Sequence, residues 1–527
     1  MQLTPEQLIT RANLAEQTKQ TWIPMLRDAY EFALPMRNLY EQTHPGTEKM
    51  DRVFDSTAIN STQKFATRMQ AGIVPPFQKW QTFEPGPETP EKIRPAVLKK
   101  LQRVREQFFN LIHTSNFDTS SSEFFMDLAS GTAIMLVLEG DDRNPIQFTA
   151  VPNAQVSMDE GPMGSVDGVF RTHTIPLRNV EATWSDISGE GKADIAKQLS
   201  ENPNGKITLL EATYFDHKAD KFRYEVVIKG FTTDPTVGAV QGQNTESKAN
   251  RIVERELEES PWIITRWIKV AGEVFGRGPL LFALPDIRTA NKVKEMILQR
   301  ASFDVAGMWA AVDDGVLNPF TVEIAPGNII PVGAANSLQP LTPSGNFDVS
   351  QLILADLQAS IKQALLDRGI PDETASVRSP TEIVERIKEM QTDIGSPFAR
   401  IMSELIIPLT NRVLGIGSRK GLIDTKIIVD GKRVKIVPTS PLATQQNLDD
   451  LQTTVQWLQL NTGMGMDIAG MGIKIEDFPA WSAEKLGVDQ TLVRDDVERE
   501  TLQNAVAQLI AQAQQANQPQ ESEPQAA

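Results

Sequence analysis

The chain has 527 residues, of which 40% are hydrophobic and 23% charged, as in globular proteins. Its 52 Lys and Arg are outnumbered by 68 Asp and Glu, and the net charge of −16 argues against a protein that wraps or grips nucleic acid. The absence of cysteine excludes disulfides, thiolate nucleophiles and zinc sites built on sulfur. A chain of this length predicts about two to four subdomains.

The sequence indicates neither a secretory signal nor a membrane-spanning segment. Residues 1–10 lack a basic region followed by an apolar one, so we read no secretory signal. No run of about eighteen apolar residues occurs, so no transmembrane helix and no membrane partner are expected.

The first 130 residues predict mainly helices. Thr4-Pro5-Glu6-Gln7 is a capping box with proline at the first helical position, and Pro24 interrupts or kinks the helix that follows. The side chains expected to be buried there are Leu14, Trp22, Met25, Leu26, Tyr30 and Phe32. Further helices are expected over 56–73, 95–115 and 121–129, with Trp80 and Phe83 in a packed strand.

From residue 131 to 270 the pattern is mostly β. Strands are expected over 131–140, 146–152, 166–177, 207–217, 222–230 and 261–270, with a short helix over 185–199 and a polar loop over 233–249. Together with the helices, these strands predict an α+β fold that is predominantly α-helical.

The stretch from Gly276 to Asp314 predicts a long amphipathic helix around which the chain is organised. Small or apolar residues recur along one stripe, at Leu280, Leu284, Ile287, Ala290, Val293, Ile297 and Ala301. Arg288, Lys292, Glu295 and Gln299 occupy the opposite face, and Pro285 is expected to kink or restart the helix.

A second helix of matching character spans Asp348 to Arg368, and its in-register residues are Ile353, Leu354, Leu357, Ile361, Ala364 and Leu365. The intervening segment, residues 305–349, contains no Lys or Arg and holds β-like pieces at TVEI and NIIPV. A polar loop follows Gly369, which is placed to end the helix.

The remaining chain predicts a long helix, a hairpin and further helices. Ser379-Pro380-Thr381-Glu382 is a second capping box, and the helix it starts is kinked at 395–397 and ends at Gly415 and Gly417. A β-hairpin over 426–438 turns on Asp430-Gly431, helices return over 445–512, and the glutamine-rich tail has low complexity.

No catalytic motif stands out. His44, His113, His173 and His217 are scattered, and no phosphate-binding loop is present. GSVDG at 164–168 imitates a nucleophile elbow only loosely, and Gly276-Arg277-Gly278 is too short to cradle phosphate. The acidic pairs 141–142, 313–314, 449–450 and 495–496 are of a kind that is usually solvated or caps a helix. We therefore expect no cofactor, no metal and no enzymatic activity.

Three blocks carry a resemblance to a known family: DSTAINSTQKFATRMQAGIVPPFQKW (55–80), the run from WIITRW to VFGRGPLLFALPDIRTANKVKE (262–295), and SPTEIVERIKEMQTDIGSPFARIMSELIIPLTNRVL (379–414). In order and spacing they resemble the portal, or head-to-tail connector, proteins of tailed bacteriophages, specifically of short-tailed podoviruses. The resemblance covers the chain from about Arg11 to the 480s.

The resemblance implies a multi-subdomain portal fold that forms a ring of twelve copies around a central channel. Its subdomains would be a wing (1–278), a first stem helix (279–304), a clip (305–348), a second stem helix (349–368), a tunnel loop (369–380), a long kinked wing helix with the hairpin (381–442), and a crown with the low-complexity tail (443–527).

Residue roles also follow from the resemblance. Stem packing between subunits would involve Leu284, Ile287, Val293, Ile297, Leu357 and Ile361. Lys362, Arg368, Asp372, Glu373 and Arg378 would lie at the DNA channel and tunnel loop, although the three cations are equally suited to a helix C-cap or a salt bridge between subunits. Clip docking would use Asp313, Asp314, Asn318 and Glu323.

The implied function is that of a portal at the capsid vertex, made in the host bacterial cytoplasm, through which double-stranded DNA is packaged and ejected without sequence specificity. The implied partners are further copies of the chain, major capsid and scaffolding proteins, terminase, and tail adaptor or nozzle proteins. Two alternatives remain open: another homo-oligomeric virion protein of the tail or internal head, and a hydrolase that uses the acidic pairs.

Overall fold

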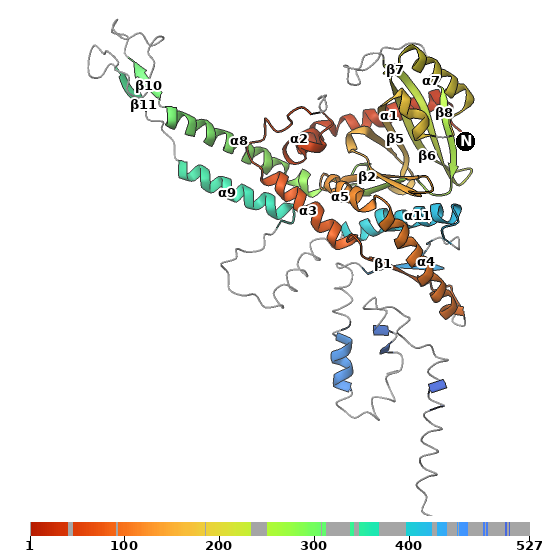
Figure 1. The fold of residues 1–527 in the computed structure, drawn as a ribbon. Helices are drawn as coiled ribbons and strands as arrows, with labels where there is room; N and C mark the ends of the chain where they lie inside the picture. The colour runs from red at the N-terminus through yellow and green to blue at the C-terminus, as the bar shows by residue number, and fades with distance from the viewer. Residues whose placement is uncertain are drawn as a thin grey trace, which may run out of the picture. The chain divides into compact units, whose positions relative to one another are not determined.

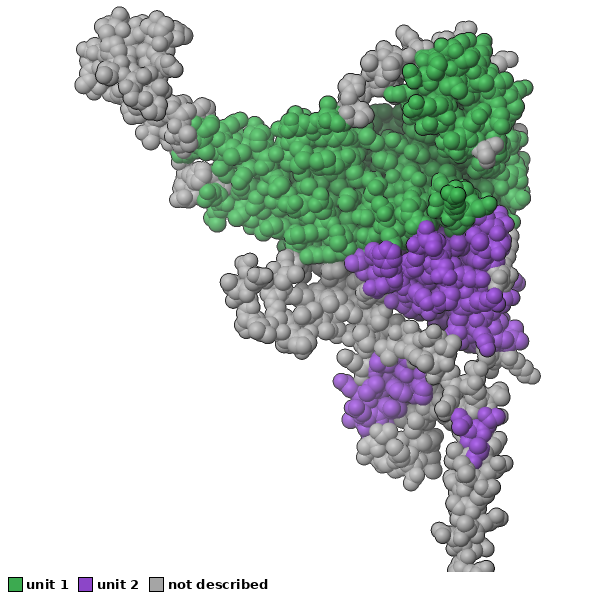
Figure 2. Space-filling model, in the orientation of Figure 1, with its two compact units in different colours: residues 1–70, 115–412 green, residues 71–114, 413–527 purple. Residues whose placement is uncertain are grey.

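The structure is a computed structural model. It describes residues 2–40, 46–90, 93–184, 186–232, 250–306, 308–311, 338–341, 347–367, 397–423, 429, 431–439, 451, 453–461, 478–479, 481–482, 501–502 and 505. The chain forms two compact units, one of residues 1–70 and 115–412 and the other of residues 71–114 and 413–527 (Figure 2).

Unit 1 begins with two helices separated where proline predicts a break. Helix α1 (Pro5–Gln20) starts at the predicted capping box, since the Thr4 side chain accepts from the Gln7 backbone and the Gln7 side chain from the Thr4 backbone. Helix α2 (Ile23–Ala33) carries Pro24 in its first turn. The expected burial of Leu14 is wrong, because its side chain is 59% exposed and α1 packs through smaller residues, Ala12 and Ala15, and through Leu8.

A five-stranded antiparallel sheet follows, in the order β4-β5-β6-β7-β8 (Figure 1). Its strands are β4 (Val156–Glu160), β5 (Val166–Pro176), β6 (Lys206–Asp216), β7 (Lys221–Thr232) and β8 (Arg251–Leu257). Buried residues of α1 pack against one set of side chains of this sheet. Trp184, Ile187 and Ile195, from the region of α6 (Val180–Thr183) and α7 (Gly189–Glu201), pack against another set. The sequence did not predict β4 and β8, which are the short, charged strands at the edges.

A smaller sheet in the order β3-β2-β9 lies in the same unit. Strand β2 (Thr132–Glu139) is its apolar centre, flanked by β3 (Ile146–Ala150) and β9 (Trp262–Arg266), and helix α5 (Phe117–Leu128) contacts β2 and β3. The remaining short elements of unit 1 are the single turns η1 (Pro35–Arg37), η3 (Asn153–Gln155), η4 (Pro162–Gly164) and η5 (Leu177–Asn179).

In unit 2, β1 (Gln81–Pro85) pairs antiparallel with β12 (Val434–Pro438), and helix α4 (Arg94–Thr114) packs on β1. Trp80, Phe83, Phe108 and Phe109 form edge-to-face aromatic contacts, which confirms the predicted packed strand. Strand β12 was predicted in a hairpin with residues 426–429; its described partner is β1, and residues 424–428 and 430 lie outside the described part of the chain.

The long helices include α3 (Thr57–Ile73), α8 (Pro279–Ala306) and α9 (Phe347–Ala364). Pro285 lies inside α8, which continues through it rather than restarting. Strands β10 (Met308–Ala311) and β11 (Leu338–Leu341) pair antiparallel between α8 and α9. The predicted pieces TVEI and NIIPV fall outside the described residues.

The structure describes the chain again from residue 397, where it is helical, with a π-helical turn, η6 (Met402–Ile406), before α11 (Ile407–Arg419). The predicted end at Gly415 and Gly417 is wrong, because α11 continues past both and Gly417 packs closely against Ile423. Among the described residues, no helix is long and apolar enough to span a bilayer. Helices and antiparallel sheets confirm the predicted α+β class.

Candidate functional site

The N-terminus of α8 is fixed to the small sheet by three glycines. A Cβ on Gly131 would lie 2.3 Å from the Gly276 carbonyl oxygen, and one on Gly278 would lie 2.2 Å from the Ala129 carbonyl oxygen. The Leu280 backbone N–H donates to the Ala129 carbonyl at 3.0 Å. The Gly-Arg-Gly turn is therefore a close backbone contact that sets where α8 begins.

Arg277, between these glycines, adds a side-chain anchor. It forms a salt bridge of 2.6 Å with Glu273, which lowers the pKa of Glu273, and its guanidinium lies 5.0 Å from the centre of the Trp22 ring. No phosphate cradle is formed here, because the glycines contact protein backbone.

Helix α9 lies alongside α8 (Figure 1). The predicted stripe is buried in the first half of α8, at Leu284 and Ile287, and in α9 at Ile361. Val293, Ile297 and Leu357 are half-buried. Because α2 also contacts α8, the apolar stripe finds partners within one chain.

This burial divides the predicted stem residues. Leu284, Ile287 and Ile361 are already buried within a single chain, and their packing against a neighbouring subunit stays a prediction. For Val293, Ile297 and Leu357 it also stays a prediction. Ile353, expected on the buried stripe, is instead 48% exposed.

Exposed apolar side chains lie elsewhere on the two helices. They are Phe282 (57% exposed), Met296 (55%), Leu298 (48%), Leu352 (73%) and Ile353 (48%). Large exposed apolar side chains concentrated on one pair of helices are typical of surfaces that contact another protein.

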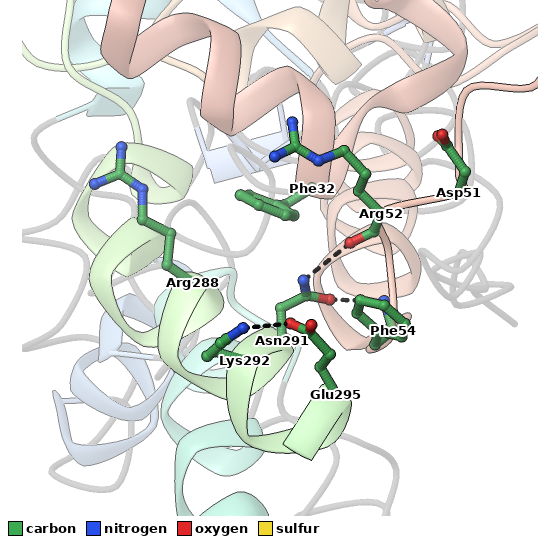
Figure 3. Close-up of a pocket in the computed structure, with 8 residues that line it drawn as sticks. All are labelled: Phe32, Asp51, Arg52, Phe54, Arg288, Asn291, Lys292 and Glu295. Carbon is green, nitrogen blue, oxygen red and sulfur yellow. Dashed lines mark hydrogen bonds and ion pairs between the residues drawn. The ribbon is translucent and has the colours of Figure 1, made fainter. Parts of the chain in front are cut away.

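Asn291 joins α8 to the chain that precedes α3 (Figure 3). Its Oδ1 accepts from the backbone N–H of Phe54 at 2.7 Å and of Asp55 at 3.1 Å, and its Nδ2 donates to the Arg52 carbonyl at 3.0 Å. Asp55 in turn accepts from Gln358 of α9 at 2.8 Å. One amide thus satisfies three backbone groups and ties both helices to the start of α3.

An open pocket of about 420 Å³ adjoins this contact. Figure 3 shows the residues that line it, which are Phe32, Asp51, Arg52, Phe54, Arg288, Asn291, Lys292 and Glu295. Each cation already has a carboxylate partner: Lys292 pairs with Glu295, Arg288 with Asp28 and Arg52 with Glu31. The cations of the lining are therefore already neutralised by carboxylates in or beside the pocket, so the pocket does not select an anion.

The C-terminal end of α9 is held by α3 through Asp367. This carboxylate is 2% exposed and accepts from Ser61 at 3.0 Å and Lys64 at 3.1 Å, and it lies 3.5 Å from Arg68. Arg68 also donates to the Leu366 carbonyl, and Leu366 has a φ of 57°. The chain leaves α9 from a fixed, strained point.

Beyond residue 396, Glu404 occupies the π-helical turn and accepts from Arg266 of β9. The guanidinium approaches to 2.7 Å and the Arg266 backbone N–H to 2.8 Å, while Arg400 donates from 3.1 Å. The extra residue of a π-turn redirects side chains, and here it points a carboxylate at the edge of the small sheet.

Sequence reasoning missed Asn291 and Asp367. Both are polar residues at positions where the helical spacing of apolar residues calls for a buried side chain. A polar residue at such a position indicates a buried hydrogen-bonding contact.

Of the predicted channel residues, Lys362 is exposed on α9. The others, Arg368, Asp372, Glu373 and Arg378, lie outside the described residues, as do the predicted docking residues Asp313, Asp314, Asn318 and Glu323. The acidic pair 141–142 caps a turn, since Asp141 accepts from the backbone N–H groups of Arg143 and Asn144. Among the described residues, no group of three or more His, Asp or Glu side chains is placed to bind a metal ion.

A protein-family model described as "Bacteriophage head to tail connecting protein" matches residues 5–493. Among curated proteins, the chain is 22% identical over 472 residues to the "Portal protein" of Salmonella phage epsilon15, covering 84% of this chain and 77% of that protein. It is 21% identical over 435 residues to the "Probable portal protein" of Bordetella phage BPP-1, covering 76% and 72% respectively.

Among solved structures, the chain is similar to one from the virion of a native gene transfer agent particle, with a TM-score of 0.33, 12% identity, and coverage of 82% of this chain and 90% of that one. A chain from the neck of the native particle, computed with C12 symmetry, gives a TM-score of 0.32 and 12% identity over 78% and 91%. These TM-scores are low, so assignment to a family rests on the family model and the curated relatives.

Proposed function

Because the chain belongs to the family of bacteriophage head to tail connecting proteins, we propose that it is a portal protein, a ring of twelve copies at one capsid vertex. The match to the family model over residues 5–493 is the observation that carries this proposal. Double-stranded DNA enters and leaves the capsid through the ring, and the protein acts as a structural conduit without enzymatic activity.

Helices α8 and α9 form the stem of this ring. Closed rotational symmetry uses two different surfaces of each subunit, so apolar residues left exposed on one chain are covered by the next. The exposed set that includes Phe282, Met296 and Leu352 supports such contacts, with the half-buried Val293, Ile297 and Leu357 at its margins. Leu284, Ile287 and Ile361 hold the helices of each subunit together and contribute to the same stem from within.

The segment after Asp367 serves as the tunnel loop at the DNA channel. Its sequence contains Arg368, Asp372, Glu373 and Arg378, and Lys362 lies on the preceding helix. Cations that contact phosphates position a duplex without reading its sequence, and the net charge of −16 per subunit prevents tight capture. The burial of Asp367 against α3 supports a fixed origin for this loop.

The segment 305–348, without Lys or Arg, forms the clip. Its Asp313, Asp314, Asn318 and Glu323 dock terminase during packaging and a tail adaptor or nozzle protein afterwards, through basic surfaces of those partners. Residues 1–278 and 381–442 form the wing, which contacts the major capsid and scaffolding proteins, and 443–527 form the crown.

Electron microscopy of the purified protein tests this function. We expect end-on views to show a ring of about twelve subunits with a channel wide enough for a duplex. Closed rings without a channel would instead indicate another structural component of the virion, and compact monomers or dimers would overturn both readings.

A further inference from the structure

Two segments of unit 2, residues 71–114 and 413–439, carry a positive net charge, against the acidic average of the chain. Residues 71–114 and 413–439 contain thirteen Lys and Arg but six Asp and Glu, whereas the rest of the chain contains thirty-nine against sixty-two. These two segments meet in the structure, because β1 pairs with β12 and α4 packs on β1. The net charge of −16 thus conceals a basic module within an acidic protein.

The charges are presented on an exposed surface. Arg94, Lys99, Lys100 and Arg103 are exposed around α4, which packs on β1 through Leu101, Val104 and Phe108. From Arg94 to Arg103 the helix rises about 13 Å, a length that spans about four phosphates of one DNA strand.

Two further cations, Lys432 and Arg433, lie beside residues 86–89. The carbonyl of Arg433 accepts from the Gly86 backbone N–H at 2.8 Å, and that of Lys432 accepts from the Glu88 N–H at 3.2 Å. A Cβ on Gly86 would lie 1.9 Å from the Lys432 carbonyl oxygen, so only glycine permits this approach. The exposed side chains of Lys432 and Arg433 are thereby held by their backbone close to the segment that leads into α4.

Arg94, Lys99 and Lys100 make no side-chain hydrogen bond or ion pair within the part of the chain that the structure describes. In unit 1 the guanidinium groups of Arg11, Arg37, Arg223, Arg255 and Arg266 are all paired with carboxylates. Charges that are left unpaired on the surface of an acidic protein are available to an anionic partner.

The character of the surface distinguishes a nucleic acid from a protein partner. The described side chains of α4 include no large apolar one that is exposed; Ile93, which is 50% exposed, precedes the helix, and Phe77, which is 79% exposed, lies 6.2 Å from the ring of His113. Protein interfaces depend on buried aromatic or aliphatic anchors, whereas duplex binding without sequence preference depends on phosphate neutralisation.

We propose that the basic surface formed by Arg94, Lys99 and Lys100 of α4 binds double-stranded DNA through its phosphates. This site is separate from the predicted channel loop, and the choice of DNA as partner rests on the proposed function. Binding is sequence-independent and weakens steeply with salt.

The test uses the full chain and a fluorescein-labelled duplex of about 30 base pairs, with anisotropy measured over a series of NaCl concentrations. The variant R94A/K99A/K100A should bind about tenfold more weakly or worse, with a slope of log K against log salt that is shallower by about 2 to 3. All three side chains are exposed, so their removal leaves the fold intact.

The matched control is K192A/K197A/K218A, which removes three exposed positive charges from unit 1. It should retain the affinity and salt slope of the unaltered protein. Equal losses in both variants would show that only net charge matters and would overturn the proposal. It would also be overturned if the α4 variant kept its DNA affinity but lost ring assembly, because the partner would then be a second copy of the chain.

Electron microscopy of the same variants separates this proposal from the proposed function. Rings that no longer bind the duplex in R94A/K99A/K100A support both. Rings whose DNA affinity does not depend on these cations refute the DNA site alone, whereas the absence of rings in the unaltered protein refutes the portal function.

Discussion

Buried polar side chains fix the register of unit 1 where apolar packing alone would allow the elements to slide. Glu211 on β6 is 1% exposed and accepts from Tyr224 at 2.6 Å, and Tyr224 accepts in turn from Trp184. Burial raises the pKa of Glu211, and Arg171 opposes that shift. Such contacts require one alignment of the strands, because each unpaired group would be left without water.

His173 on β5 makes the stability of this region sensitive to acid. Its ring lies 6.3 Å from that of Trp184, its Nδ1 is buried without a hydrogen bond, and burial, followed by Arg171, lowers the pKa of His173 to about 3. The folded protein therefore keeps this ring neutral, while the unfolded chain takes up a proton near the ordinary pKa of 6.5. Stability should fall as the pH decreases from about 6.5 toward 3.

We expect His173→Gln to remove this part of the acid dependence. Between pH 7 and pH 5 the unaltered protein should lose about 2 kcal/mol more than the variant, measured as free energy of unfolding in urea. Measurement of both proteins at pH 8 is the control, since the ring is neutral in both states there. Parallel pH profiles would contradict the assignment.

At the scale of elements, backbone contacts position α8 as much as its apolar stripe does. Gly131, Gly276 and Gly278 bring the chain before β2 and the turn before α8 within a distance that no side chain permits. The stripe then specifies which face of α8 is buried, and Asn291 and Asp367 lock α8 and α9 to α3 and the segment before it. An apolar pattern determines a face of a helix, whereas specific contacts determine its position along the axis.

Gly131→Ala should test this anchor. Gly131 has a φ of 119° and no space for a Cβ, so we expect a loss of about 3 kcal/mol or more in the free energy of unfolding. Gly272→Ala is a matched control, because Gly272 has a φ of 79° but nothing within 4 Å of an added Cβ. It should cost about 1 kcal/mol. Similar losses in thermal or urea unfolding would show that backbone conformation, and not the close contact, is what matters.

At the scale of the whole molecule, helices α8 and α9 leave large apolar side chains exposed that the rest of the described chain does not cover. The same two helices bury Leu284, Ile287 and Ile361 within the chain. They therefore carry an inner set of apolar side chains that is buried and an outer set that is exposed. The inner set belongs to the single chain, and we propose that the outer one belongs to the assembly.

We expect Leu352→Lys with Ile353→Lys to prevent ring assembly without unfolding the subunit. The two side chains are 73% and 48% exposed, so a single chain tolerates the change, while a lysine buried between subunits is left unpaired at a cost of several kcal/mol. Sedimentation velocity should show subunits in place of rings.

The matched variant is Leu14→Lys with Met36→Lys, which adds the same charges at side chains that are 59% and 73% exposed. It should assemble normally. Rings formed by the first variant would exclude this face of α9 from the subunit interface.

The sequence by itself determined what depends on local chemistry. Capping residues, proline and the 3.6-residue spacing located α1, α2, α3, α8 and α9, and alternating or continuous apolar runs located most strands, because hydrogen bonding and burial act over a few residues there. The order of three sequence blocks was enough to indicate the family, which the match over residues 5–493 confirms.

Tertiary structure decided what depends on residues that are distant in the sequence. Edge strands β4 and β8 carry charge and are recognised only through their pairing, and β12 pairs with β1, some 350 residues earlier in the chain. The burial of Leu284, Ile287 and Ile361 within one chain follows from packing with α2 and α9, which periodicity does not reveal. The basic character of residues 71–114 and 413–439 is recognised only in the structure, which brings the two segments together. The net charge of the whole sequence averages over all residues and does not show a local surface.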